Sequence, residues 1–179
     1  MDYAGYRISL QANFGRMKGS VQIDVGIGDI VIPILRDLCL FQYKDKPMFE
    51  SEISLMVYPL ETIFAEKLET VISKGSTNSR VKDYHDLLLL TRESHMINSK
   101  DLPEAIKSTF HHLGTHLELI NFEDHEIKSL EKFWTAHLKN LGERAINLEI
   151  PKDIQNVILE INYFIENLNL KVEPLIFKK

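Results

Sequence analysis

Residues 60–74, LETIFAEKLETVISK, mark the point at which the sequence changes from a strand pattern to a helix pattern. The apolar residues of this region recur three and four positions apart: Leu60, Ile63, Phe64, Leu68, Val71 and Ile72. This spacing places them on one side of a helix that turns about 100° per residue. Gly75 follows directly, and glycine is common where a helix ends. The sequence therefore predicts an amphipathic helix that begins near Leu60 and ends before Gly75.

The part of the chain before this helix is predicted to be mostly sheet. Apolar and polar residues alternate over residues 6–14, which is the period of a half-buried strand. The alternation resumes over residues 21–27, after a turn-like stretch at 15–19 with glycine at both ends. These two segments are expected to form a hairpin, and residues 53–57 are expected to form a further short strand.

The remainder of the chain is predicted to be mostly helical. Further helical segments are expected over residues 81–91, from Asp101, over about 124–141 and after Pro151. We therefore predict an α+β fold, with a small N-terminal antiparallel or mixed sheet followed by a helical bundle. The expected boundary separates residues 1–58, the sheet, from residues 59–179, a helical region packed on it in one compact unit. A chain of 179 residues with 44% apolar content can bury one sizeable core.

Charge and cysteine content narrow the function classes. The 21 basic and 26 acidic side chains give a formal charge of -5, which argues against a protein that covers nucleic acid with positive surface. The single cysteine, Cys39, excludes an intrachain disulfide and suits a reducing compartment. No apolar run approaches the roughly 18 residues that span a bilayer. We expect a cytoplasmic protein without membrane contact.

Lys67 is the residue that interrupts the predicted helix face. It falls within the apolar stripe, near Phe64 and Leu68, where an unpaired ammonium group is costly to bury. One interpretation gives Lys67 a partner, either a carboxylate or a bound anion such as phosphate. The alternative is that its aliphatic stem lies along the apolar surface and its ammonium group reaches water.

Asp24 lies in residues 22–26, QIDVG, on the strand face opposite Ile23 and Val25. A carboxylate held on a strand can project into a cleft and bind magnesium, which commonly takes one or two carboxylates together with substrate phosphates. The alternative is a solvated surface position, because antiparallel sheets often have one wet face.

Asp83 and Asp86 lie three residues apart, so on a helix they share a face, and Arg80 and Lys82 lie close by. This group could form a charged site. The alternative is that acidic residues favour the first turn of a helix, which explains Asp83 better than Asp86. Residues 87–90 are all leucine and predict a helix that is apolar on nearly every side. A buried helix that contains Asp86 needs a partner for it.

His111, His112 and His116 suggest a metal site, because His112 and His116 are one helical turn apart. The sequence has no HExxH motif and no cysteine near them. Ordinary surface or half-buried histidines are therefore the favoured interpretation.

Three blocks follow one another in a recognisable order: YAGYR at residues 3–7, QIDVGIGD at 22–29 and YPLETIFAEKL at 58–68. A fourth block, NSRVKDYHDL, occupies residues 78–87. Together they resemble the AbiEii/AbiGii toxin family of nucleotidyltransferases, specifically over about residues 3–115 and loosely thereafter.

The resemblance implies a nucleotidyltransferase core followed by a helical part. Such proteins move nucleotides from a nucleoside triphosphate (NTP) onto an acceptor such as a tRNA end, and many are toxins restrained by a separate antitoxin. By resemblance, Asp24 is a catalytic carboxylate that binds Mg²⁺, and Lys67 is a base that contacts phosphate. The further site residues are catalytic Asp83 and Asp86 and substrate-binding Arg80 and Lys82.

The sequence departs from the family in one motif. Relatives open with a glycine-glycine or glycine-serine turn followed by an Asp-x-Asp pair, whose metal ions orient the triphosphate, and no Asp-x-Asp pair, with or without such a turn before it, occurs in this sequence. With Asp24 alone, weak Mg²⁺ binding is expected.

Three functional hypotheses follow. In the first, the chain is a truncated or split enzyme, residues 1–58 are a remnant of the core sheet, and a separately encoded N-terminal half supplies the missing motif. In the second, the chain is a non-catalytic interaction module that binds an antitoxin, RNA or that half. The third, less favoured, is an unrelated metal-dependent hydrolase that uses the histidines.

Overall fold

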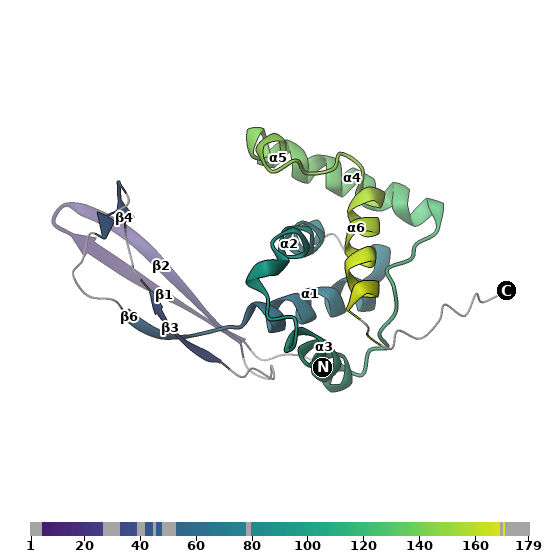
Figure 1. Ribbon diagram of the computed structural model, residues 1–179. Coiled ribbons are helices and arrows are strands. Elements are labelled where there is room, and N and C mark those ends of the chain that lie inside the picture. The colour runs from purple at the N-terminus through teal and green to yellow at the C-terminus, as the bar shows by residue number, and fades with distance from the viewer. Residues whose placement is uncertain are drawn as a thin grey trace. The chain divides into compact units, whose positions relative to one another are not determined.

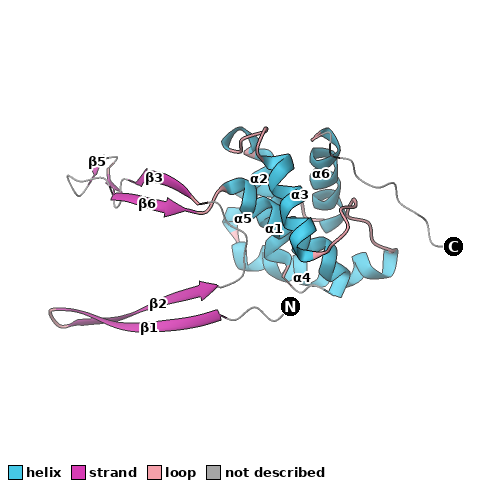
Figure 2. Ribbon diagram, turned by 90° about the horizontal axis from the view of Figure 1, so that it is seen from below, coloured by secondary structure: helices cyan, strands magenta, loops and turns pink. Residues whose placement is uncertain are grey.

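The computed structural model describes residues 5–26, 33–38, 42–44, 46–47, 53–77, 80–168 and 170. The chain divides into two compact units, Met1–Val31 and Ile32–Lys179. Strands make up the described part of the first unit, and the helices lie in the second (Figure 2). The predicted α+β class, with small antiparallel sheets followed by helices, is confirmed.

The first unit contains the predicted N-terminal hairpin. Strand β1 (Gly5–Phe14) pairs with strand β2 (Met17–Gly26) in antiparallel register, from Gly5 opposite Gly26 to Phe14 opposite Met17. The turn is shorter than the stretch expected from the sequence, because pairing already resumes at Met17. Gly15 has a φ of 60°, a left-handed conformation that glycine adopts without a steric penalty.

Apolar side chains of this hairpin gather on one face. The register sets four apolar cross-strand pairs opposite one another: Tyr6 with Val25, Ile8 with Ile23, Leu10 with Val21, and Phe14 with Met17. All eight side chains are exposed. Directly opposed apolar and aromatic side chains stabilise a hairpin by their mutual contact. These pairs are therefore the main packing interactions within the described part of the first unit.

Two short hairpins precede the helices of the second unit. Strand β3 (Ile34–Leu38) pairs with β6 (Ile53–Val57), and β4 (Gln42–Tyr43) pairs with β5 (Lys46–Pro47), in both cases antiparallel. Strand β6 confirms the prediction for residues 53–57. The sequence did not predict β3, β4 or β5; two-residue strands such as β4 and β5 are too short to show a period.

Helices form the rest of the second unit. They are α1 (Leu60–Lys74), the 3₁₀ turn η1 (Gly75–Thr77), α2 (Val81–Arg92), the 3₁₀ turn η2 (Ser94–Met96), α3 (Leu102–Leu113), α4 (Asp124–Leu141), α5 (Glu143–Asn147) and α6 (Ile154–Asn167). Helix α1 ends where the sequence predicted, at Gly75 with a φ of 58°. Among the residues that the structure describes, no helix is long and apolar enough to cross a membrane.

Helix α2 is central to the helical packing. It contacts α1, α4 and α6, and Figure 1 shows it between α1 and α4. The core lies between these helices and α3, and its largest fully buried side chains are Trp134, Tyr84, Phe64, Leu68, Leu87, Leu88, Leu102, Ile106, Leu130, Ile154, Ile161 and Ile165. The leucine run at 87–90 contributes two of them, which explains why this short helix can pack on several sides.

An aromatic group joins α2 to α4. The Trp134 side chain is fully buried, and its indole Nε1 donates a hydrogen bond of 3.0 Å to the Pro151 carbonyl. Its ring packs near those of His85 and His137, at centroid distances of 6.5 and 5.5 Å. Nε2 of His137 lies 3.1 Å from Nδ1 of His85, so one imidazole donates to the other. This group fixes the spacing between the two helices.

Asn162 provides a test of the packing of α6. Its amide pairs with both backbone groups of buried Ile120, accepting from the N–H at 2.9 Å and donating to the carbonyl at 2.8 Å. Replacing Asn162 with alanine should lower the free energy of unfolding by about 1–3 kcal/mol, because both groups lose their partner. Urea denaturation measures this loss. The control Asn167→Ala removes an exposed bond to the Tyr163 carbonyl and should have a much smaller effect; equal losses would contradict the assignment.

The histidine pair predicts a pH dependence of stability. Burial lowers the pKa of His85, and the neighbouring His137 lowers it further; burial and then the positive charge of Lys82 lower the pKa of His137. The unfolded chain therefore takes up protons first as the pH falls below about 6.5, and the free energy of unfolding should decrease there. Above that pH the stability is fully present.

Urea denaturation at about pH 7.5 and about pH 5.5 measures this loss of stability. The loss should be smaller in His137→Gln than in the unchanged chain. The control is His125→Gln, whose imidazole is exposed and should leave the loss unaltered. A pH dependence that His137→Gln does not reduce would contradict the role of the pair.

Candidate functional site

Lys67 forms ion pairs that link α1 to α2. Its neighbours Phe64 and Leu68 are fully buried, while its own side chain is 24% exposed. The ammonium nitrogen lies 2.6 Å from Oδ2 of Asp86 and 3.3 Å from Oδ1 of Asp83. Of the interpretations left open by the sequence, the structure therefore shows a lysine with carboxylate partners.

Asp83 is the buried member of this cluster. Its side chain is only 2% exposed, in the first turn of α2, where the N-terminal end of the helix dipole favours a negative charge. Besides Lys67 it has a second cationic partner, because Nε of Arg80 lies 3.1 Å from its Oδ2. Two cations thus compensate a carboxylate that would be costly to bury alone.

Asp86 differs from Asp83 in exposure. The sequence suggested a buried carboxylate on a helix that is apolar on nearly every side, but the Asp86 side chain is 43% exposed. The reason is that Asp86 lines an open hollow between α2 and α4. The expected partner for Asp86 is present, since Lys67 contacts it at 2.6 Å. Asp86 is therefore the carboxylate of the cluster that a ligand can reach.

An open hollow of about 490 Å³ lies beside the cluster. We call it the α2–α4 hollow, and its lining residues are Lys67, Arg80, Val81, Lys82, Asp83, Asp86, Phe133, Ala136, His137 and Asn140. Sites for small organic ligands commonly measure about 300–1,000 Å³, so the hollow has room for a mononucleotide. Five of the six site residues predicted from the sequence line it. Its lining holds three cationic side chains against two carboxylates, which favours an anionic ligand.

The sequence analysis did not identify the wall of the hollow that α4 provides. Phe133, Ala136, His137 and Asn140 follow one another at three, four and seven positions along α4, so they share one helix face. That spacing is visible in the sequence. The sequence does not show that this face lies against α2, because the contact between α4 and α2 joins residues about fifty positions apart.

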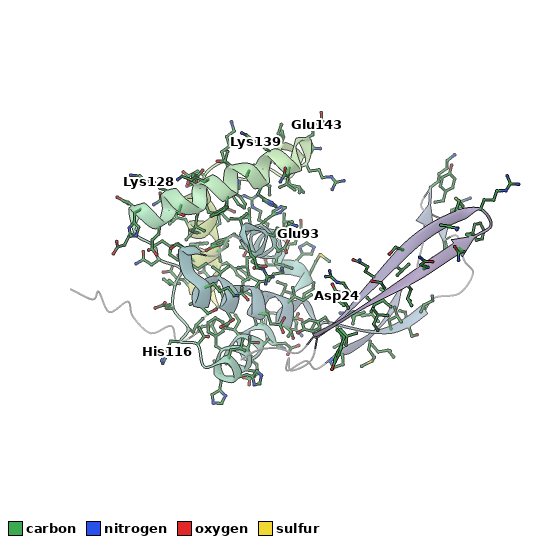
Figure 3. All side chains as sticks on the ribbon, turned by 180° about the vertical axis from the view of Figure 1, so that it is seen from behind. Asp24, Glu93, His116, Lys128, Lys139 and Glu143 are labelled. Atoms are coloured by element: carbon green, nitrogen blue, oxygen red, sulfur yellow. The ribbon has the colours of Figure 1, made fainter. Side chains whose placement is uncertain are left out.

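Asp24 belongs to the hairpin unit (Figure 3). The strand register places it opposite Arg7, whose guanidinium contacts both carboxylate oxygens, Oδ1 at 2.6 Å and Oδ2 at 2.9 Å. This hydrogen bonding lowers the pKa of Asp24. The structure therefore shows Asp24 as an exposed, ion-paired carboxylate, and its binding of Mg²⁺ remains a prediction.

The described residues do not fit a metal site built by the protein alone. No group of three or more histidine, cysteine, aspartate or glutamate side chains in that part of the chain could hold a metal ion. Asp24 binds Arg7 with both oxygens, and Asp83 is enclosed by two cations. His112 and His116 do not share a helix, because α3 ends at Leu113 and Gly114 turns the chain away.

Some positions of the family blocks lie outside the described residues. They are residues 3–4 of the first block, 27–29 of the second and 78–79 of the fourth. The positions that carry the charged cluster all lie within the described part of the chain.

Comparison with known families gives one finding. The family model described as nucleotidyl transferase AbiEii toxin, type IV TA system, matches residues 1–158. Comparison with curated proteins and with solved structures found no match. The matched segment includes the hairpin, the charged cluster and the α2–α4 hollow. The chain therefore belongs to the nucleotidyl transferase AbiEii toxin family of type IV toxin-antitoxin systems.

Proposed function

We propose that the chain transfers a nucleotide from an NTP to an RNA acceptor, for which a tRNA end is the leading candidate. The observation that carries this proposal is the cluster of Lys67, Asp83 and Asp86 at the edge of a cation-rich hollow, in a member of a nucleotidyl transferase family. The net negative charge of the chain is compatible with it, because the positive side chains are gathered locally.

In the proposed reaction, a hydroxyl oxygen of the acceptor attacks the α-phosphorus of the NTP. The bond between the α-phosphorus and the bridging oxygen breaks, and pyrophosphate leaves. The ammonium group of Lys67, with Lys82 and Arg80 at the same hollow, is suited to stabilise the charge that develops on the phosphate oxygens. Asp86, the exposed carboxylate, is the group available to take the hydroxyl proton.

Asp83 has a positioning role in this proposal. It is buried and does not meet a ligand directly, but it holds the Lys67 ammonium from one side while Asp86 holds it from the other. Fixing a cation before the substrate arrives reduces the rearrangement needed during the reaction.

Nucleotidyl transfer commonly uses divalent ions, which would supply positive charge to the phosphate groups. The family implies such an ion together with the NTP. Since the described residues do not form a metal site alone, we propose that Mg²⁺ arrives bound to the triphosphate. Asp24 of the hairpin unit stays a separate proposed Mg²⁺ ligand. Asp24 would first have to exchange Arg7 for the ion.

The family also implies a cognate antitoxin as partner. A second candidate function is a non-catalytic module that binds this antitoxin, RNA or a separately encoded N-terminal half. The pairing of both Asp24 oxygens with Arg7 favours it, because this carboxylate must release Arg7 before it can bind a metal ion.

Asp86→Asn tests the proposed site. The amide keeps the shape of the side chain and can still accept from Lys67, but it cannot take a proton. With purified chain, α-labelled NTPs, Mg²⁺ and total tRNA, the variant should label RNA about 100-fold more slowly than the unchanged chain, or slower still. The matched control is Glu93→Gln, the same charge change at the exposed end of α2, which should keep full activity.

Absence of labelling by the unchanged chain with all four NTPs would overturn the proposed activity. RNA binding without labelling would then support the non-catalytic module. Labelling that survives Asp86→Asn at full rate would overturn the role of Asp86.

Comparing Asp24→Asn with Arg7→Gln separates two roles for Asp24. If its carboxylate binds a metal ion during the reaction, Asp24→Asn should slow labelling strongly and raise the Mg²⁺ concentration that the remaining activity requires. Arg7→Gln should then leave the activity intact, because it frees the same carboxylate. If the pair is only structural, both variants should change the activity equally and by little, since an exposed ion pair adds little stability.

A further inference from the structure

The α2–α4 hollow has two chemically different sides. Lys67 and the N-terminal turn of α2 provide a charged side with cations and carboxylates. The α4 side offers an aromatic ring, a methyl group, an imidazole and a carboxamide, none of which carries a formal charge at neutral pH. A ligand that fills the hollow must therefore combine an anionic part with a flat or polar part.

We propose that the α4 wall seats the base of the nucleoside triphosphate, with Phe133 stacking on the ring and His137 and Asn140 contacting its edge. This assignment rests on the proposed function and adds to it a wall that binds the nucleobase. The shared chemistry is a nucleobase carried on a phosphate, and the NTP is the source that the three cationic side chains of the hollow favour.

Phe133 is the residue on which a base can stack. Its side chain is 43% exposed although the neighbouring Trp134 is fully buried, so the ring is on the open side of α4 and not in the core. Ala136, one turn further along, has a small side chain that leaves space beside the ring. Bases stack on such exposed aromatic rings in proteins that bind single-stranded nucleic acid, whichever base is present.

His137 and Asn140 supply polar groups at the same wall. Nε2 of His137 contacts His85, so Nδ1 is the ring nitrogen that it can offer a ligand. Burial and the charge of Lys82 lower the pKa of His137, which keeps the imidazole neutral at neutral pH. The Asn140 amide, one turn away, offers both donors and an acceptor. Together they could distinguish one base edge from another.

The test is a binding titration followed by the fluorescence of Trp134, the single tryptophan of the chain. The ligands are the four NTPs, inorganic tripolyphosphate and a short single-stranded RNA without a triphosphate. Phe133→Leu removes the ring and keeps an apolar side chain. It should weaken NTP binding about tenfold and leave tripolyphosphate binding unchanged, because only the base loses its contact.

Two further variants sharpen the result. Tyr163→Leu removes an aromatic ring that is 71% exposed on α6, and it should bind NTPs as the unchanged chain does. Asn140→Ala should change the order of affinity among the four NTPs without affecting tripolyphosphate. Unchanged near-ultraviolet circular dichroism would show that Trp134 keeps its surroundings in each variant.

The outcomes separate this inference from the proposed function. Equal affinity of Phe133→Leu and the unchanged chain for every NTP would overturn the base site, while RNA labelling would still support the transferase. A loss confined to the RNA would also overturn it and assign the wall to the acceptor. If the unchanged chain bound neither NTPs nor tripolyphosphate, both proposals would fail.

Discussion

The buried carboxylate of Asp83 is the constraint on which the helical unit depends. An aspartate that is 2% exposed needs compensating charge, and it receives this from Arg80, just before its own helix, and from Lys67 in α1. Removing one partner of a buried pair typically costs about 3–5 kcal/mol, because the remaining charge stays without compensation. This need for compensating charge fixes how α1 is aligned with α2. Since α2 also packs against α4 and α6, the same ion pairs set the geometry of the hollow.

Packed apolar and aromatic side chains support this charged cluster. Leu87 and Leu88 of α2 are fully buried in the core, and Trp134 with the histidine pair holds α4 at a fixed spacing from α2. Both histidines have lowered pKa values, so this contact adds no positive charge beside Lys82 at neutral pH. A dry boundary on one side of an ion pair strengthens its electrostatic interaction relative to bulk water. The core and the site are thus parts of the same packing arrangement.

Local patterns predicted most of the elements. The helical period predicted α1 and its end at Gly75, and the misplaced charge of Lys67 predicted a partner, because both depend on residues close in sequence. The exposure of Asp86 and the α4 wall could not be predicted in this way, since they depend on which side of α2 its neighbours leave open. The contact between Arg7 and Asp24 could not be predicted in this way either. It follows from the strand register, and a turn two residues shorter or longer would shift that register.

Lys67 has a structural role and a proposed functional role. Its contact with Asp83 belongs to the structural role, and its contact with Asp86 belongs to the functional one. A phosphate that approaches Lys67 must compete with a carboxylate for the ammonium group. Displacing Asp83 would leave a buried charge with only Arg80, whereas Asp86 is 43% exposed and can be solvated when it is released. Releasing Asp86 from Lys67 therefore costs less free energy than releasing Asp83, because water can replace the lost partner of Asp86. This holds although the contact of Lys67 with Asp86 is shorter than its contact with Asp83. Ligand binding can therefore open one half of the cluster while the other half continues to hold α1 against α2.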